Sequence, residues 1–314
     1  MSTRDQLLAL NDELRRLKAG GQRAVSVTED ALAQLREAVS AAQAEAVTET
    51  VTPPTTSTFS IAPAARPAAP AILSTAPTAP TAAPAMPATP VIKLPEGDKQ
   101  AQWNYLRDLV LNDATCRSHI YAGKKVVFGV GSLAASIMFV GEAPGGDEED
   151  QGEPFVGRAG QLLNKMIKAM GLERGQVYIG NILNWRPEMG SRNPDGSQTG
   201  NRPPTAQEMA YCLPFIRAQI AIIRPKVLVA LGKTAVDGLL GADRFKSMGA
   251  ARGTWHSYAD TPLRASYHPS YLLRQEGLTS ASAKKIKRDA WEDMLAVMEQ
   301  ASVPVSEKQK NFFL

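Results

Sequence analysis

The segment Ala135-Ser-Ile-Met-Phe-Val-Gly141 is a short apolar run that leads directly into the glycine-rich turn Gly141-Glu-Ala-Pro-Gly145. A run of this length, closed by turn residues, is typical of a strand buried on both faces. Three later segments have the same character, at 177–181, 226–231 and 264–267. Amphipathic or apolar stretches that predict helices lie around and between them, at 103–111, 160–170, 205–223, directly after 231, and at 280–299. Strands that alternate with helices predict an α/β fold, a three-layer sandwich around a short, mostly parallel four-stranded sheet.

Composition divides the 314-residue chain into parts. Residues 51–97 are almost wholly Pro, Ala, Thr and Ser and contain half of the chain's 22 prolines, so we expect a disordered linker there. Residues 98–302 form the predicted globular domain, and 303–314 a C-terminal tail. Residues 1–50 predict two helices, and the leucines of 4–18 form a narrow apolar stripe. That stripe fits either a protein partner or a solvated helix without one.

Charge and cysteine content exclude several classes of protein. The sequence has no run of about 18 apolar residues and no basic-then-apolar start, so we expect neither a membrane span nor a signal peptide. Two cysteines make no disulfide framework, which favours a reduced cytoplasmic protein, taken here as a monomer. A net charge of +4 is compatible with a nucleic-acid partner but does not require one.

Unusual sequences follow three of the predicted strands, where parallel sheets bind ligands. The first is the turn after Gly141, which continues through an acidic stretch into Pro154-Phe-Val-Gly-Arg-Ala-Gly160. It lacks the lysine of a phosphate-binding loop and the spacing of a dinucleotide site. The second is Asn181, whose amide offers one donor and one acceptor to a base edge. The third is Ser266-Tyr-His-Pro-Ser-Tyr-Leu-Leu-Arg274, where apolar residues beside a cation suit a loop that wedges into DNA.

Taken singly, these residues have ordinary alternatives. Phe155 fits a core anchor, Asn181 a structural cap and His268 a structural histidine. Together, however, the segments from Val126 to Arg274 resemble the uracil-DNA glycosylase superfamily, and most closely its family-four branch. The long stretches Pro154–Gly160 and His268–Arg274 carry most of this resemblance.

The resemblance implies an enzyme of base excision repair that flips uracil out of DNA and hydrolyses its N-glycosidic bond. Phe155 would stack on the base, Asn181 would read its N3 and O4 edge, and His268 would donate to O2 as charge develops. Glu142, which the resemblance implies is catalytic, and Ala143, which it places at the base, would stand where other branches carry a glutamine and a water-activating aspartate. Because Ala143 cannot activate water, Glu148 is the predicted residue for orienting it or for stabilising the cationic sugar. Tyr271, Leu272, Leu273 and Arg274 would contact DNA and fill the space of the flipped nucleotide.

The sequence departs from the family at its iron–sulfur cluster. Family-four enzymes hold the cluster with four cysteines, but here only Cys116, helped at most by His119, and Cys212 remain, and Trp185 replaces another ligand. An indole cannot ligate iron. We therefore predict that the cluster is lost and that no cofactor is needed, with Trp185 packed near both cysteines and the loop 189–200 close by.

Two other functions stay open on sequence alone. A non-catalytic module could bind uracil or abasic DNA while its N-terminal segment, 1–50, holds a repair or replication partner, and the absence of an aspartate at position 143 favours this. An accessory domain of a polymerase complex is the weaker alternative.

Overall fold

The computed structural model describes residues 86–190, 198–275, 278 and 280–313. Contacts between Cα atoms divide the chain into two units, Met1–Pro77 and Thr78–Leu314, and all of the described residues belong to the second. The predicted N-terminal helices and most of the predicted linker lie outside the described residues. None of the helices described is both long enough and apolar enough to cross a membrane.

A mixed six-stranded sheet with the order β1-β3-β2-β4-β6-β5 forms the centre of the second unit. Its strands are β1 (Val130–Gly131), β2 (Ile137–Gly141), β3 (Tyr178–Asn181), β4 (Val227–Leu231), β5 (Trp255–Tyr258) and β6 (Thr261–Ser266). The four predicted strands are the central, parallel ones. The strand count was too low because β1 has only two residues and β5 is half exposed, so neither has the apolar pattern of a buried strand. The turn that joins β5 to β6 contains no glycine, although Ala259 and Asp260 both have positive φ.

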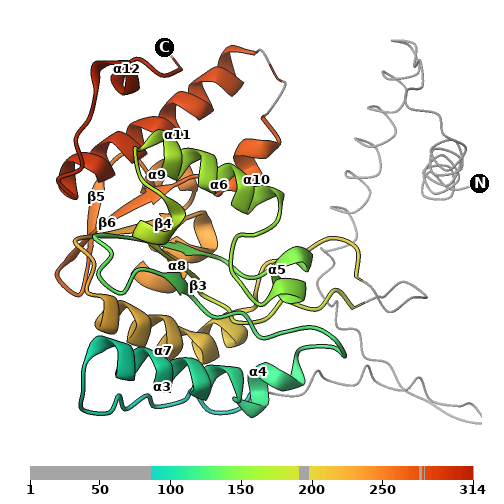
Figure 1. Cartoon of the computed structure of the whole chain (residues 1–314). Coiled ribbons are helices and arrows are strands. Elements are labelled where there is room, and N and C mark those ends of the chain that lie inside the picture. Colours follow the sequence, from blue (N-terminus) through green and yellow to red (C-terminus); the bar gives the residue numbers. More distant parts are fainter. Residues whose placement is uncertain (1–85, 191–197, 276–277, 279, 314) are drawn as a thin grey trace, which may run out of the picture. The chain divides into compact units, whose positions relative to one another are not determined.

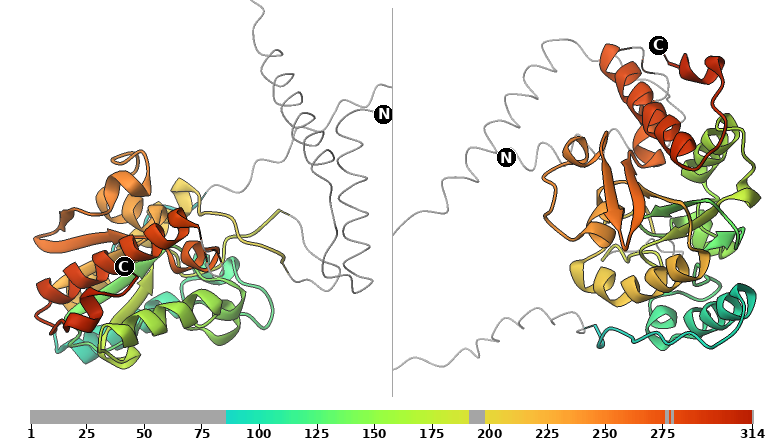
Figure 2. Two further views of the ribbon diagram at one scale, coloured as in Figure 1. Left: turned by 90° about the horizontal axis from the view of Figure 1, so that it is seen from above. Right: turned by 90° about the vertical axis from the view of Figure 1, so that its left-hand side faces the viewer.

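Helices cover both faces of the sheet, as predicted (Figure 1). The helices are α3 (Lys99–Leu111), α4 (Ala114–Ser118), α5 (Gly146–Gln151), α6 (Arg158–Ala169), α7 (Ala206–Ile223), α8 (Lys233–Leu240), α9 (Met248–Ala251), α10 (Pro269–Leu273), α11 (Ala281–Gln300) and α12 (Glu307–Lys310), with a short 3-10 helix at Arg174–Gln176. Alternate residues of β2 face opposite layers: Met138 and Val140 pack with α3, α7 and α8, whereas Ile137 and Phe139 pack with α6 and α11. Figure 2 shows α3 and α11 on opposite sides of the sheet. The three-layer α/β sandwich is therefore confirmed.

Residues on both sides of the predicted domain, 98–302, also pack against its core. Met86, Ile92 and Leu94 fall in the predicted linker, yet they pack against the core cluster beside α3 and α7. The predicted C-terminal tail is also packed, because Gln309 donates from Nε2 to the Ala169 carbonyl at 2.7 Å and accepts with its own carbonyl from the Trp291 indole at 2.6 Å. In the first segment prolines separate the apolar residues, and in the second a polar stretch separates Val303 and Val305 from Phe312, so neither segment has a continuous apolar pattern.

The carboxyl ends of the parallel strands meet at one edge of the sheet. Gly141 of β2 pairs in register with Asn181 of β3, and Leu231 of β4 pairs with Ser266 of β6. The turns that leave these strands contain the three unusual sequences that were identified as candidate ligand-binding segments. The topology thus gathers segments more than 120 residues apart around one site.

Candidate active site

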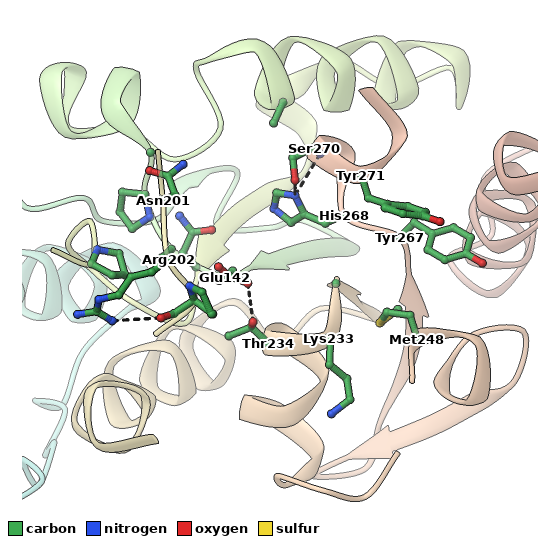
Figure 3. A pocket seen from close by; sticks show the side chains of 18 of the residues that line it. Glu142, Asn201, Arg202, Lys233, Thr234, Met248, Tyr267, His268, Ser270 and Tyr271 are labelled. Carbon is green, nitrogen blue, oxygen red and sulfur yellow. Dashed lines mark hydrogen bonds between the residues drawn. The ribbon is translucent and has the colours of Figure 1, made fainter. Parts of the chain in front are cut away.

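A cavity of about 830 Å³ lies at this edge of the sheet. Its lining includes all six predicted catalytic and base-binding residues, namely Glu142, Ala143, Glu148, Phe155, Asn181 and His268. Tyr271 and Arg274 also line it, and Figure 3 shows His268 and Glu142 among the side chains around the pocket. The cavity is far larger than a single pyrimidine ring requires, so it has room for a base together with part of its sugar and strand.

Phe155 occupies this site with a backbone that few residues adopt. Its φ is 55°, in the left-handed region, and its side chain is only 5% exposed. The ring fits because Gly141 has no side chain: a Cβ there would lie 2.4 Å from the ring tip. Gly160 allows the same loop to turn, since a Cβ at that position would lie 1.9 Å from the Phe155 carbonyl oxygen. The aromatic ring is thereby placed 5.5 Å from the ring of His268, centroid to centroid.

Asn181 is buried at the end of β3, with 6% of its surface exposed. Its side-chain Oδ1 has no hydrogen-bond partner in the described part of the chain. A buried amide oxygen without a partner costs about 1–3 kcal/mol. Because Asn181 lines the cavity, a ligand that donates a hydrogen bond from a planar edge would remove this cost.

His268 is the N-cap of α10, and its imidazole is fixed by the nearby Ser270. The backbone N–H of Ser270 donates to Nδ1 at 3.1 Å, and the Ser270 hydroxyl lies 2.8 Å from the same nitrogen. An Nδ1 that accepts leaves the proton on Nε2, so the neutral ring is a donor. Burial, and secondarily the positive charge of Arg274, lower the pKa of His268 to about 4. The site therefore holds a neutral imidazole at physiological pH.

The two glutamates differ in what holds them. Glu148 accepts from the Gly145 amide with Oε2 and from the Val156 and Gly157 amides with Oε1, at 2.9–3.0 Å. These three bonds tie the first turn to the Phe155 loop, so the contacts of Glu148 support a positioning role rather than the water-orienting role we predicted. Glu142 instead accepts the Thr234 hydroxyl with Oε2 and lines the cavity. Ala143 beside it offers only a methyl group to the cavity.

The residues of the predicted DNA-contacting segment, 271–274, lie in or next to α10 and differ in how far they are exposed. Leu272 is 6% exposed on the short helix α10, which contacts α6, and its predicted role as a wedge stays a prediction. Leu273 is half-buried and does not line the cavity, so its predicted contact with DNA stays a prediction. Arg274 is exposed and lies over the Tyr271 ring, 5.5 Å from its centroid. Tyr271 in turn lies 5.2 Å from Tyr267, and both rings border the cavity in Figure 3.

Sequence reasoning missed several lining residues, among them Lys233, Thr234, Arg202, Met248 and Tyr267. Lys233 and Thr234 follow β4 directly, and the rule that ligands bind beyond strand ends would have included them. Arg202 lies in a loop and Met248 begins the short helix α9, and neither belongs to a motif, so the sequence gave no signal for them.

The four positions that would hold the family's iron–sulfur cluster come together in the core. The His119 and Trp185 rings stack with centroids 4.4 Å apart, and Cys116 and Cys212 are both fully buried in the same cluster. A hydrogen bond with Cys212, followed by burial, raises the pKa of the Cys116 thiol. Trp185 belongs to the same core cluster as both cysteines, and its predicted packing against them stays a prediction. Residues 191–197 of the 189–200 loop lie outside the described residues.

This donor set does not fit a four-ligand cluster. It offers two thiols and one imidazole, and the His119 Nδ1 is already bonded to the Thr115 carbonyl at 2.8 Å. No group of three or more His, Cys, Asp or Glu among the residues described could hold a metal ion. The remaining ligand position is occupied by Trp185, whose indole is fully buried.

An aromatic ring, an unpartnered amide and a neutral imidazole around one cavity define a site for a planar, hydrogen-bonding heterocycle. The sequence profile described as "Uracil DNA glycosylase superfamily" matches residues 128–295, which hold all of these groups. The chain belongs to this superfamily.

Its similarity to individual members points to one branch. It is 34% identical over 187 residues to the type-4 uracil-DNA glycosylase of Pyrobaculum aerophilum, a match that covers 58% of this chain and 89% of that protein. It is 41% identical over 150 residues to the type-4 enzyme of Thermotoga maritima, covering 48% and 72% respectively. A type-5 uracil-DNA glycosylase of Pyrobaculum aerophilum is 30% identical over 181 residues, covering 52% and 74%. The resemblance to family four is thereby confirmed.

Proposed function

We propose that this protein is a monofunctional uracil-DNA glycosylase that acts on uracil-containing DNA in base excision repair, leaving an abasic site. The observation that carries the proposal is the neutral His268 facing the same cavity as the Phe155 ring and the unpartnered Asn181 amide. The type-4 relatives support the same activity by name.

Recognition of the base follows from the groups that line the cavity. A uracil flipped from the stack would lie against the Phe155 ring, with its N3–H donating to Asn181 Oδ1 and its O4 accepting from Nδ2. Cytosine has a lone pair at N3 and an amino group at C4, so both contacts would be mispaired with the amide held in this orientation. Unpaired buried polar groups are among the strongest means of rejecting a wrong ligand.

Cleavage requires stabilisation of the departing base. When the bond between N1 and the sugar breaks, negative charge accumulates on the base, including at O2. The Nε2–H of His268 would donate to that oxygen. A preorganised donor in a buried site stabilises developing charge without further reorganisation, which is worth about 10²–10³ in rate for one donor.

The sugar that remains is cationic and must be attacked by water. We assign the attack of water on the sugar to Glu142, because its carboxylate lines the cavity and is oriented by the Thr234 hydroxyl. Glu148 would act indirectly, by holding the turn and the Phe155 loop together. Two steps follow: water adds at C1′ of the sugar with loss of a proton, and the uracil anion is protonated to give the free base.

The test is release of free uracil from an oligonucleotide with a single uracil, measured by chromatography and by strand cleavage in alkali. We expect release from uracil-containing DNA and none from the matched cytosine oligonucleotide. Protein that binds the uracil oligonucleotide without releasing the base would contradict the proposal and support the non-catalytic binding module, which the methyl side chain of Ala143 favours.

A further inference from the structure

Arg174 is the one cation whose side chain reaches the backbone beneath the stacking ring, among the residues that the structure describes. It begins the 3-10 helix Arg174–Gln176, 19 residues along the chain from Phe155. Its Nη1 donates to the Phe155 carbonyl at 3.1 Å, and its Nη2 donates to the Pro154 carbonyl at 2.6 Å. Nη1 also donates to Asn164 Oδ1 on α6 at 3.0 Å. One guanidinium therefore spans two consecutive carbonyls and an adjacent helix.

The backbone held in this way is strained. A non-glycine residue in the left-handed region costs on the order of 1–3 kcal/mol and persists only where its surroundings impose it. Glu148 accepts from the two amides that follow Phe155, and Arg174 donates to the two carbonyls at and before it. The backbone at Phe155 is thus held by the Glu148 carboxylate on one side and by the Arg174 guanidinium on the other.

The hydrogen bonds at position 174 depend on the planar, forked guanidinium of arginine. A lysine ammonium is a single point charge and cannot reach Pro154, Phe155 and Asn164 with fixed, planar donors. Arg174 does not line the cavity, so it would act on a bound base only through Phe155. Its side chain is part-buried in these hydrogen bonds, which limits its access to a DNA phosphate.

We propose that Arg174 is a positioning residue for base recognition: it holds Phe155 in the left-handed conformation that places the ring flat against the flipped base. This inference rests on the proposed function, since the inference specifies how the site positions Phe155 against its base. It predicts that Arg174 contributes to turnover only while the Phe155 ring is present.

A double-mutant cycle tests this. Arg174→Gln should lower kcat/KM for a uracil oligonucleotide by about 10-fold or more, because base–aromatic stacking is worth roughly 5- to 150-fold. In a Phe155→Ala background the same change should alter kcat/KM by less than about twofold, because no ring remains to be positioned. Arg174→Lys should fall between the wild type and Arg174→Gln. Lys168→Gln removes an exposed cation from nearby α6 and should leave kcat/KM unchanged.

Affinity for DNA with an abasic-site analogue provides the second readout, since no base then occupies the cavity. Arg174→Gln should bind this DNA within about twofold of the wild type. An equal loss of activity in both backgrounds, or an equal loss of abasic-site affinity, would overturn the proposal and make Arg174 a folding or DNA-contacting residue. Unfolding of both Arg174 variants at the assay temperature would overturn it in the same way. Wild-type protein that releases no uracil would contradict the proposed function itself.

Discussion

The buried imidazole of His268 makes the stability of this protein depend on pH in a specific direction. In the folded protein its pKa is about 4, lowered from the ordinary 6.5 first by burial and then by Arg274. Between about pH 6.5 and pH 4, His268 is therefore protonated in the unfolded chain but neutral in the folded protein. The folded state loses about 1.4 kcal/mol for each pH unit in this window, because the unfolded state binds more protons there. Over the 2.5 units between the two values, the loss is about 3 kcal/mol.

Replacement of the imidazole isolates this contribution. We would measure the free energy of unfolding in urea at pH 7.5 and 4.5 for the wild type and for His268→Gln. At pH 4.5, two units below the unfolded pKa, the wild type should have lost roughly 2.5 kcal/mol more than the variant. His119 and His256 are present in both proteins, so their contributions cancel in the difference. An equal loss of stability in both proteins would refute the assignment of a buried, neutral His268.

The same assignment predicts how activity responds. Uracil release should show no titration of His268 between pH 6 and 8, because the ring stays neutral throughout that range. His268→Gln should lower turnover on the order of 10²-fold while its affinity for abasic-site DNA changes only a few-fold, because the Nε2–H bond strengthens as the base leaves. A fall in wild-type activity with a midpoint near pH 6.5 that disappears in the variant would show that the ring is charged in the resting enzyme.

Three further predictions concern recognition, domain limits and iron. Asn181→Asp should reduce the preference for uracil over cytosine by at least about tenfold, measured as relative release from matched oligonucleotides, and an unchanged preference would show that Asn181 is not the reader. Deletion of residues 1–85 should leave the melting temperature within a degree or two. Deletion of 1–97 should lower it by several degrees, because it removes the packed Met86, Ile92 and Leu94, and equal melting temperatures would show that this packing is not stabilising. Anaerobically purified protein should contain less than stoichiometric iron and no cluster absorbance near 400 nm, and a brown protein with a full complement of iron would contradict the predicted loss.

The four central strands and the six predicted residues of the cavity were predictable from sequence because each lies in or beside a local signal. Apolar runs such as 226–231 have the length and composition of buried strands. Each unusual residue in the turns could have a structural role by itself, but their combination in one chain favours a functional site. The resemblance to a known superfamily then added roles for Phe155, Asn181 and His268. These residues line one cavity because parallel strands bring their carboxyl ends to one edge.

The features that the sequence did not reveal depend on long-range contacts. Nothing local to Arg174 marks it, because its partners lie 19 and 20 residues away in the chain. The burial of Leu272 depends on which side of α10 faces α6, and a five-residue helix has too little periodicity to show this. Glu148 was assigned to water because it is acidic and near a motif, whereas its three amide partners become apparent only when the loop is folded.

The position of the altered cluster ligands relative to the cavity explains how one can change without the other. Cys116 of α4, Cys212 of α7 and Trp185 belong to one buried core cluster, and none of them is among the described residues that line the cavity. The chain between the two sites is fixed by Arg186, which donates to Glu149 of α5 at 2.9 Å and to Asn201 at 2.8 Å. Asn201 and Pro187 do line the cavity, so this arginine ties its wall to α5 without any ligand from the cluster positions. Because these bonds hold the wall without a cluster ligand, we expect that the residues proposed to read and release the base need not change when the cluster positions do.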